Sequence, residues 1–175
     1  IVGGLSHLPR PRAVLVSISL AFFVLALAAP FVYIRPAYAG PELFAPEQLA
    51  RQYAAPAVSG RDLFYGDQAR LIGFGLNRPS VAPGEWLDVT ACWMATRPMT
   101  INHTVFVHLL GRENLVIGAR TTWPGLGRFS TSQWPVGRAF CDTIPVRVET
   151  WANGPELYDI EVGLYDAKTD ERLEA

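Results

Sequence analysis

The sequence predicts an all-β fold, an antiparallel β-sandwich of immunoglobulin-like or jelly-roll type, preceded by one transmembrane α-helix. Three observations carry this prediction. Residues 13–34 form a run of 22 residues without a charge. After residue 67 the chain becomes a series of short runs rich in Val, Ile, Thr and aromatic residues, separated by turn signals such as Ala82-Pro83-Gly84. No run is followed by a long amphipathic helix, which argues against parallel βαβ architecture.

The run of residues 13–34 is long enough to cross a membrane. As a helix it would measure about 33 Å, and a bilayer hydrocarbon core is about 30 Å thick. Phe31 and Tyr33 lie where an interfacial aromatic belt would be. The run therefore predicts a membrane anchor.

A cleaved signal peptide is the alternative. Residues 37–39, Ala-Tyr-Ala, match a cleavage pattern that would release the chain after Ala39, and Arg10 and Arg12 would supply the positive region before the apolar run. However, the run is longer than the usual signal core of about 7–15 residues. Arg35 also interrupts the approach to the site. We favour the anchor and keep both interpretations open.

Basic residues predict the orientation of an anchor. Arg10 and Arg12 precede the run and Arg35 follows it. This excess places the N-terminal side in the cytoplasm and residues 36–175 outside it. The expected organisation is a cytoplasmic flank (1–12), a transmembrane helix (13–34), a Pro-rich stalk (35–66) and a β-sandwich domain (67–175).

Alternation identifies the buried faces of two expected strands. In residues 86–95, Val89, Ala91 and Trp93 fall on one face. In residues 156–166, the expected core face is the apolar set Tyr158, Ile160, Val162 and Leu164.

Composition and motifs exclude several classes of function. The 175 residues carry a net charge of −1, whereas a nucleic-acid-binding domain would present a basic face, so no nucleic-acid partner is expected. The sequence shows no nucleophile–base arrangement, no phosphate-binding Gly loop and no metalloprotease motif. His103 and His108 are five apart on one expected strand and would point to opposite faces. We therefore predict no catalytic residue, no metal site and no cofactor in this chain.

Cys92 and Cys141 are the two cysteines. An even pair outside the cytoplasm suggests a disulfide, which would close a loop of about 50 residues and stabilise the domain by about 3–4 kcal/mol. The alternative is two unpaired thiols on different strands.

One segment could bind a ligand. Residues 121–137 hold three aromatic side chains among Gly, Ser and Thr. Exposed aromatic faces can stack on sugar rings while polar neighbours bind hydroxyl groups, so Trp123, Arg128, Phe129 and Trp134 are candidate glycan-binding residues. In the alternative interpretation, which we favour, the tryptophans cover the open edge of the sandwich.

Five segments occur in an order typical of a known family: GDQARLIGFGL, VAPGEWLDVTACW, TVFVHLL, TSQWPVGRAFCD and DIEVGLYDAKTDERL. The chain resembles the C-terminal extracytoplasmic region of bacterial dolichyl-phosphate-mannose-protein mannosyltransferase-like membrane glycosyltransferases of the Chloroflexi type. In that family a last transmembrane helix ends in a segment like Ile34–Ala39 and leads into a β-sandwich. One departure is Asp170, where the family's last hairpin often has Gly; Asp tolerates a left-handed turn better than most residues.

The resemblance implies sugar transfer from a lipid-linked donor outside the cytoplasmic membrane of a bacterium. The family's catalytic carboxylates lie in a first external loop, near the N-terminus of the full protein. This chain would then be a non-catalytic accessory domain that positions a glycan or acceptor, or braces the enzyme. Its implied partners are the lipid bilayer, a glycan or lipid-linked sugar, and an upstream transmembrane domain of the same polypeptide. The alternatives are a structural or protein-interaction module without sugar binding, or a secreted carbohydrate-binding protein.

Overall fold

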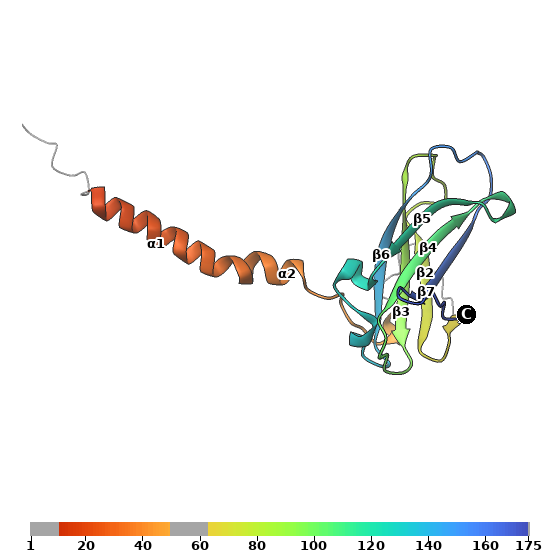
Figure 1. Ribbon diagram of the computed structural model, residues 1–175, viewed down its shortest axis with the longest axis horizontal. Coiled ribbons are helices and arrows are strands. Elements are labelled where there is room, and N and C mark those ends of the chain that lie inside the picture. The colour runs from red at the N-terminus through yellow and green to blue at the C-terminus, as the bar shows by residue number, and fades with distance from the viewer. Residues whose placement is uncertain (1–10, 50–62, 175) are drawn as a thin grey trace, which may run out of the picture. The chain divides into compact units, whose positions relative to one another are not determined.

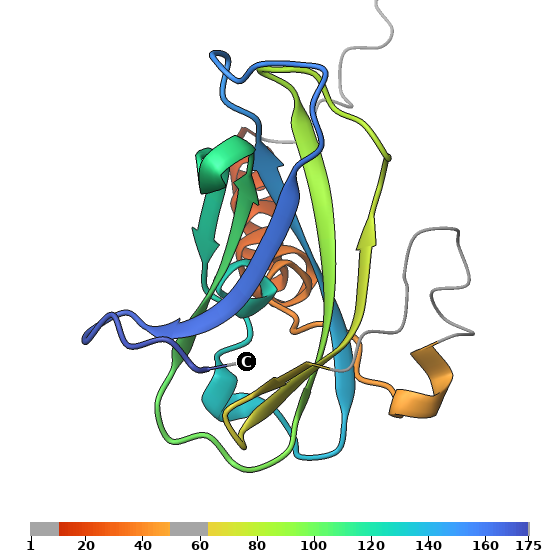
Figure 2. The ribbon, with the colours of Figure 1, turned by 90° about the vertical axis from the view of Figure 1, so that its right-hand side faces the viewer.

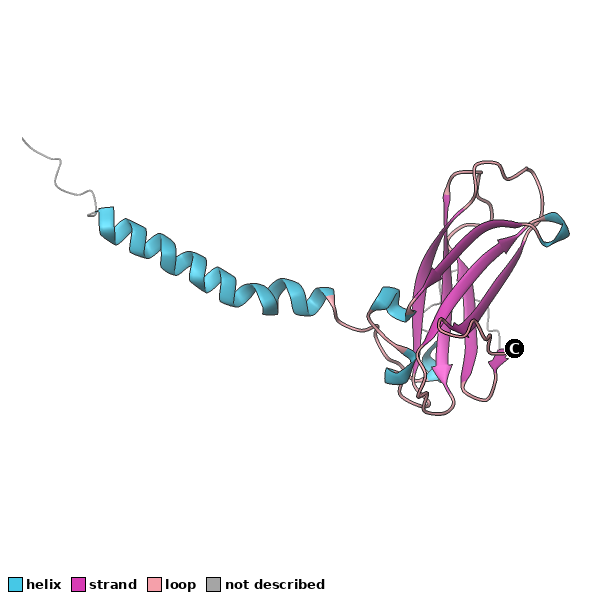
Figure 3. Ribbon diagram, in the orientation of Figure 1, coloured by secondary structure: helices cyan, strands magenta, loops and turns pink. Residues whose placement is uncertain are grey.

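The computed structural model describes residues 11–49 and 63–174, and the chain divides into two compact units, Ile1–Ala39 and Gly40–Ala175. Figure 1 shows the elements of each unit. The described residues of the first unit are mainly helical, and those of the second form strands joined by loops and short helical turns (Figure 3).

The described part of the first unit is an apolar helix over residues 11–37 with one irregular turn. Helix α1 spans Pro11–Ala29, a π-helical turn spans Pro30–Ile34, and α2 spans Arg35–Ala37. Pro30 has no amide hydrogen to donate, and the backbone hydrogen bonds change here from the α-helical spacing of four residues to five. The Arg35 amide donates to the Pro30 carbonyl. The apolar span Ala13–Ile34 has 22 residues, which is long enough to cross a membrane.

The second unit contains two antiparallel sheets that face each other as a sandwich (Figure 2). The four-stranded sheet has the order β1-β2-β3-β6 and the three-stranded sheet has the order β5-β4-β7. The strands are β1 (Leu63–Tyr65), β2 (Ala69–Leu76), β3 (Trp86–Ala95), β4 (His103–Leu110), β5 (Val116–Thr122), β6 (Ala139–Arg147) and β7 (Asp159–Asp166).

The core lies between the sheets, on the faces that alternation predicts. Val89, Ala91 and Trp93 of β3 are fully buried. On and beside β7, Leu164 is fully buried, and the other three predicted residues, Tyr158, Ile160 and Val162, are partly buried and pack against the core. The period of two is therefore sufficient to orient both strands.

The β domain begins earlier than the predicted boundary at residue 67. Phe44 lies in the predicted stalk but is buried, and its backbone exchanges two hydrogen bonds of 2.9 Å with Ala139. Strand β1 also precedes residue 67 and places Tyr65 in the core. Pro-rich spacing indicates irregular backbone, but it does not show whether apolar side chains within that backbone are packed. Residues 50–62 of the predicted stalk, and residues 1–10 of the predicted flank, lie outside the described residues.

Antiparallel pairing sorts the connections between strands into two ends of the domain. We call one of them the entry end, because the chain arrives there at Gly40; it holds residues 40–44, 66–68, 96–102, 123–138 and 167–171. The opposite end, which we call the far end, holds residues 77–85, 111–115 and 148–158.

The last hairpin accommodates Asp170 in the expected way. Its φ is 59°, a left-handed conformation, and its amide donates to the Asp166 carbonyl at 2.8 Å. The turn returns the chain to β7, where Arg172 pairs with Tyr165.

Candidate functional site

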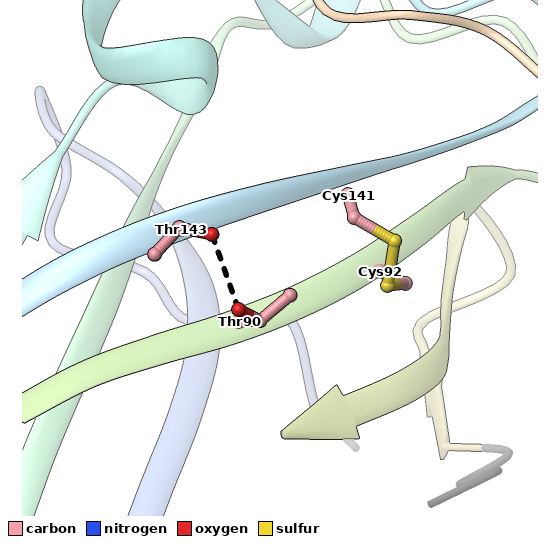
Figure 4. The surroundings of a disulfide bond; sticks show 4 residues. All are labelled: Thr90, Cys92, Cys141 and Thr143. Atoms are coloured by element: carbon pink, nitrogen blue, oxygen red, sulfur yellow. Dashed lines mark hydrogen bonds between the residues drawn. A yellow bond between two sulfur atoms is a disulfide. The ribbon is translucent and has the colours of Figure 1, made fainter. Parts of the chain in front are cut away.

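Cys92 and Cys141 are joined by a disulfide (Figure 4). They are directly paired across the neighbouring strands β3 and β6 and are 49 residues apart in the chain. The hydroxyl groups of Thr90 and Thr143 are paired on the same two strands, 3.1 Å apart. The bond therefore joins two strands of one sheet, rather than linking the two sheets.

The disulfide and the apolar helix point to the same compartment. Disulfides persist in oxidising environments outside the cytoplasm, and an N-terminal apolar helix acts as an anchor or as a signal. Together they indicate an extracytoplasmic β domain.

Trp134 is a core residue rather than a ligand platform. Its side chain is 4% exposed, and its ring lies 4.7 Å from the Phe140 ring and 6.1 Å from the Trp93 ring. Its indole N–H donates to the Phe129 carbonyl at 3.1 Å. Because the ring is enclosed and its polar atom is satisfied, Trp134 has no free face on which a sugar could stack.

Phe129 also faces inward. It is half-buried, and its ring meets the Phe140 ring edge to face at 5.0 Å. The other two predicted residues, Trp123 and Arg128, are exposed, and the Arg128 Nε donates to the Gly125 carbonyl at 3.0 Å. The four candidate glycan-binding residues are thus split between the core and the surface. The burial of Trp134 agrees with the alternative interpretation, in which the tryptophans cover the open edge of the sandwich.

The loop that carries Trp123 and Arg128 is held by a buried carboxylate. Asp142 of β6 is 7% exposed and its Oδ2 accepts a hydrogen bond of 2.7 Å from the Gly125 amide. Burial raises the pKa of Asp142, because the charged form loses solvation. The backbone amides of Gly125 and Leu126 and the Arg128 guanidinium oppose that rise in pKa by stabilising the charged form.

Three consecutive residues of this loop are left-handed. The φ angles are 63° at Gly125, 53° at Leu126 and 89° at Gly127. Glycine adopts such angles readily, but leucine does so at a cost of about 1–2 kcal/mol. Leu126 is nevertheless 45% exposed. The loop therefore holds an apolar side chain in the solvent in an unfavourable backbone conformation.

Asp142 and Leu126 were not among the predicted site residues. For Asp142 a signal existed, because alternation along β6 places it on the same face as Phe140, Ile144 and Val146, which are buried. A carboxylate on an apolar face needs a polar partner. For Leu126 the only hint was its position between two glycines.

The two histidines lie apart on β4 and serve different roles. His108 pairs with Glu161 through Nδ1 and Oε2, which are 2.9 Å apart, and Arg172 pairs with the same carboxylate at 2.8 Å. His103 is buried, and burial lowers its pKa, so the neutral form is favoured. Within residues 11–49 and 63–174, no group of three or more His, Cys, Asp or Glu side chains could hold a metal ion.

The far end contains an apolar cavity of about 420 Å³. Leu76, Leu109, Ile117 and Tyr158 contribute to its wall, and Glu156 to its polar part. Glu156 Oε2 lies 3.5 Å from Arg112 Nε. This volume is within the range of small-molecule pockets.

The fold and these contacts define a class: a two-sheet β domain that follows an apolar helix and carries a disulfide within one sheet. No protein-family model matches the chain, and no curated protein matches it either.

Proposed function

We propose that the chain is an extracytoplasmic accessory domain, held to the membrane by its helix, that braces a membrane glycosyltransferase and has no catalytic role of its own. The burial of Trp134 is the observation that favours bracing over glycan binding. A glycan-binding loop needs exposed aromatic faces, whereas this loop uses Trp134 and Phe129 to close the entry end of the sandwich.

The anchoring part of the proposal is supported by the helix itself. The side chains of the apolar span are exposed, with Phe22 and Phe31 about 70% accessible. An apolar helix 22 residues long exposes more apolar surface than water tolerates. A bilayer would cover that surface. The preceding arginines favour a cytoplasmic N-terminal side.

The enzymatic context is supported by the resemblance of five ordered segments to the mannosyltransferase-like family of bacterial membrane proteins. In that context the cytoplasmic membrane of a bacterium is the location, and an upstream transmembrane domain of the same polypeptide carries the active site. The lipid-linked sugar is then a partner of the whole enzyme and not of this domain.

Strand order favours the jelly-roll alternative for the fold. Immunoglobulin constant domains have the sheets ABED and CFG, that is, 1-2-5-4 and 3-6-7 in chain order. The pairing of β3 with β6, with the β4–β5 hairpin in the other sheet, is common to this domain and the immunoglobulin order. The placement of β7 differs, because β7 pairs with β4, beside that hairpin, whereas the seventh immunoglobulin strand pairs with the sixth. This departure is what favours the jelly-roll alternative.

A membrane-extraction experiment tests the anchor. We expect the expressed chain to remain in the membrane fraction after carbonate washing and to have an intact mass that includes residues 13–39. Release of a soluble chain that begins at Gly40 would contradict the anchor and would support the secreted alternative.

A deletion tests the brace. In the complete polypeptide, removal of residues 40–175 should lower the amount of folded enzyme in the membrane, whereas Trp123→Ala should leave sugar transfer unchanged. Glycan binding is the second candidate because Trp123 and Arg128 are exposed. A loss of glycan affinity in the Trp123→Ala variant, with folding intact, would favour that second candidate.

A further inference from the structure

We propose that the entry loop, residues 123–128, docks on the membrane surface, with Trp123 and Leu126 at the boundary between lipid headgroups and acyl chains. The inference rests on the proposed anchoring by the helix. It adds a second membrane contact, made by the β domain itself.

The backbone of the entry loop is fixed so that the Leu126 side chain is exposed at its tip. The Asp142 carboxylate accepts a hydrogen bond of 2.7 Å from the Gly125 amide, and Gly125, Leu126 and Gly127 are all left-handed. An exposed leucine in that conformation carries a backbone cost that a glycine would not have, and it leaves apolar surface exposed to water. Backbone strain that persists at an exposed apolar residue points to a binding role.

The exposed side chains suit a lipid interface. Trp123 is 44% exposed and Leu126 is 45% exposed. Tryptophan prefers the headgroup region of bilayers, and leucine gains free energy by entering the acyl region. Ile101 and Val136, each 50% exposed, add apolar surface at the same end of the domain.

The path of the chain singles out this end. Gly40 lies against the Phe129 ring, and Pro41 lies against Gly125, so the chain enters the β domain beside the entry loop. The last helical residue is Ala37. Three residues of extended chain span about 10 Å. A helix that spans the bilayer therefore tethers the entry loop close to the lipid headgroups.

The far end supplies an internal control. Trp151 is 53% exposed and Leu157 is 97% exposed, so the far end is at least as apolar on its surface. The chain does not enter the domain there, and the tether does not bring that end to the bilayer. Exposure alone would predict equal lipid contact at both ends, whereas our proposal predicts contact at the entry end.

Tryptophan fluorescence of the full chain in lipid vesicles tests the proposal. All five tryptophans lie between residues 86 and 151, so the emission reports only on the β domain. The chain would be reconstituted into phosphatidylcholine vesicles that carry a spin label near the top of one acyl chain. We expect quenching, and we expect Trp123→Phe to remove more than half of it. The matched variant Trp151→Phe should leave the quenching unchanged.

A second pair of variants protects against misfolding. Leu126→Asp should lower the quenching without changing the circular dichroism spectrum, and Leu157→Asp should not. A chain that floats with the vesicles but shows no quenching would overturn the docking proposal and leave the anchor intact. A chain that does not float would contradict the anchor and the docking proposal together. Equal losses in Trp123→Phe and Trp151→Phe would also overturn docking at the entry end.

Discussion

The two ends of the β domain both expose tryptophan and leucine side chains, yet they are built differently. The entry end is reinforced by the enclosed Trp134, the buried Asp142 and, at the start of β6, the disulfide. At the far end, residues 152–158 line a cavity of about 420 Å³ and Leu157 is almost fully exposed. The exposed apolar residues of the two ends are therefore not equivalent. At the entry end they lie beside buried side chains and a disulfide that hold the backbone in place, whereas at the far end they lie beside a cavity.

The largest effect should come from Trp134. Truncating a buried tryptophan to alanine costs about 3–5 kcal/mol, because apolar contacts are lost and a cavity remains. We expect Trp134→Ala to lower the free energy of unfolding by that amount, measured by urea denaturation of the full chain in detergent. Trp151→Ala at the far end should change it by no more than about 0.5 kcal/mol. Equal losses in the two variants would remove the distinction between the ends.

The disulfide should rank next. It closes a loop of 49 residues, for which chain entropy predicts a stabilisation of about 3–4 kcal/mol. The double variant Cys92→Ser/Cys141→Ser should lose that stability, and reduction of the wild-type chain should give the same loss. If the reduced and oxidised chains unfolded at the same urea concentration, the disulfide would have no part in supporting the entry end.

Sequence patterns were sufficient for the strands but not for the loop. The period of two along β3 and β7 depends only on neighbouring residues, so it identified Trp93 and Leu164 as core residues. The burial of Trp134 depends on Trp93, 41 residues earlier in the chain, and on how the β5–β6 connection folds back. A loop of Gly, Ser and Thr gives no local signal for that path.

The same contrast explains the domain boundary and the site. Phe44 is buried because it reaches Ala139, a pairing that no local pattern encodes. Asp142 was within reach of sequence reasoning, since it interrupts an apolar face of β6. The hydrogen bond to Gly125 could not have been derived, because it depends on three left-handed residues in a row.

Asp142 should have a smaller, pH-dependent effect. Asp142→Ala leaves the Gly125 amide without its acceptor, at a cost of about 1–3 kcal/mol. Hydrogen exchange should then become faster at Gly125–Gly127 and stay unchanged at residues 150–158. Unchanged exchange at Gly125–Gly127 would show that the carboxylate does not hold the loop.

The sign of the pH dependence follows from the pKa. Burial raises the pKa of Asp142 above its ordinary value of 3.8, so the folded domain holds this proton more tightly than the unfolded chain. The stability that protonated Asp142 contributes to the folded domain is therefore fully present below pH 3.8, and it is lost as the pH rises through the pKa of Asp142 in the folded state. Relative to Asp142→Asn, the wild-type chain should lose stability over that interval. A relative gain would mean that the amides and Arg128 outweigh burial and lower the pKa.

The smallest effect should come from Leu126. Glycine tolerates a φ of 53°, so Leu126→Gly removes backbone strain from the folded domain. The same substitution raises the conformational entropy of the unfolded chain, which lowers stability. We expect a net change within about 1 kcal/mol in either direction. At the far end, Leu157→Gly should have a similarly small effect on stability. A loss of several kcal/mol in Leu126→Gly would show that Leu126 supports the fold and is not held out for binding.

The central claim is that the β domain is extracytoplasmic and linked to the apolar helix, and the redox state of its two cysteines in cells tests this claim most directly. We would label thiols in cells that express the whole chain, and in cells that express a chain without residues 1–39. We predict that Cys92 and Cys141 of the whole chain are labelled only after reduction, whereas the shortened chain is labelled without it. Free thiols in the whole chain would contradict an extracytoplasmic location and, with it, the brace outside the membrane.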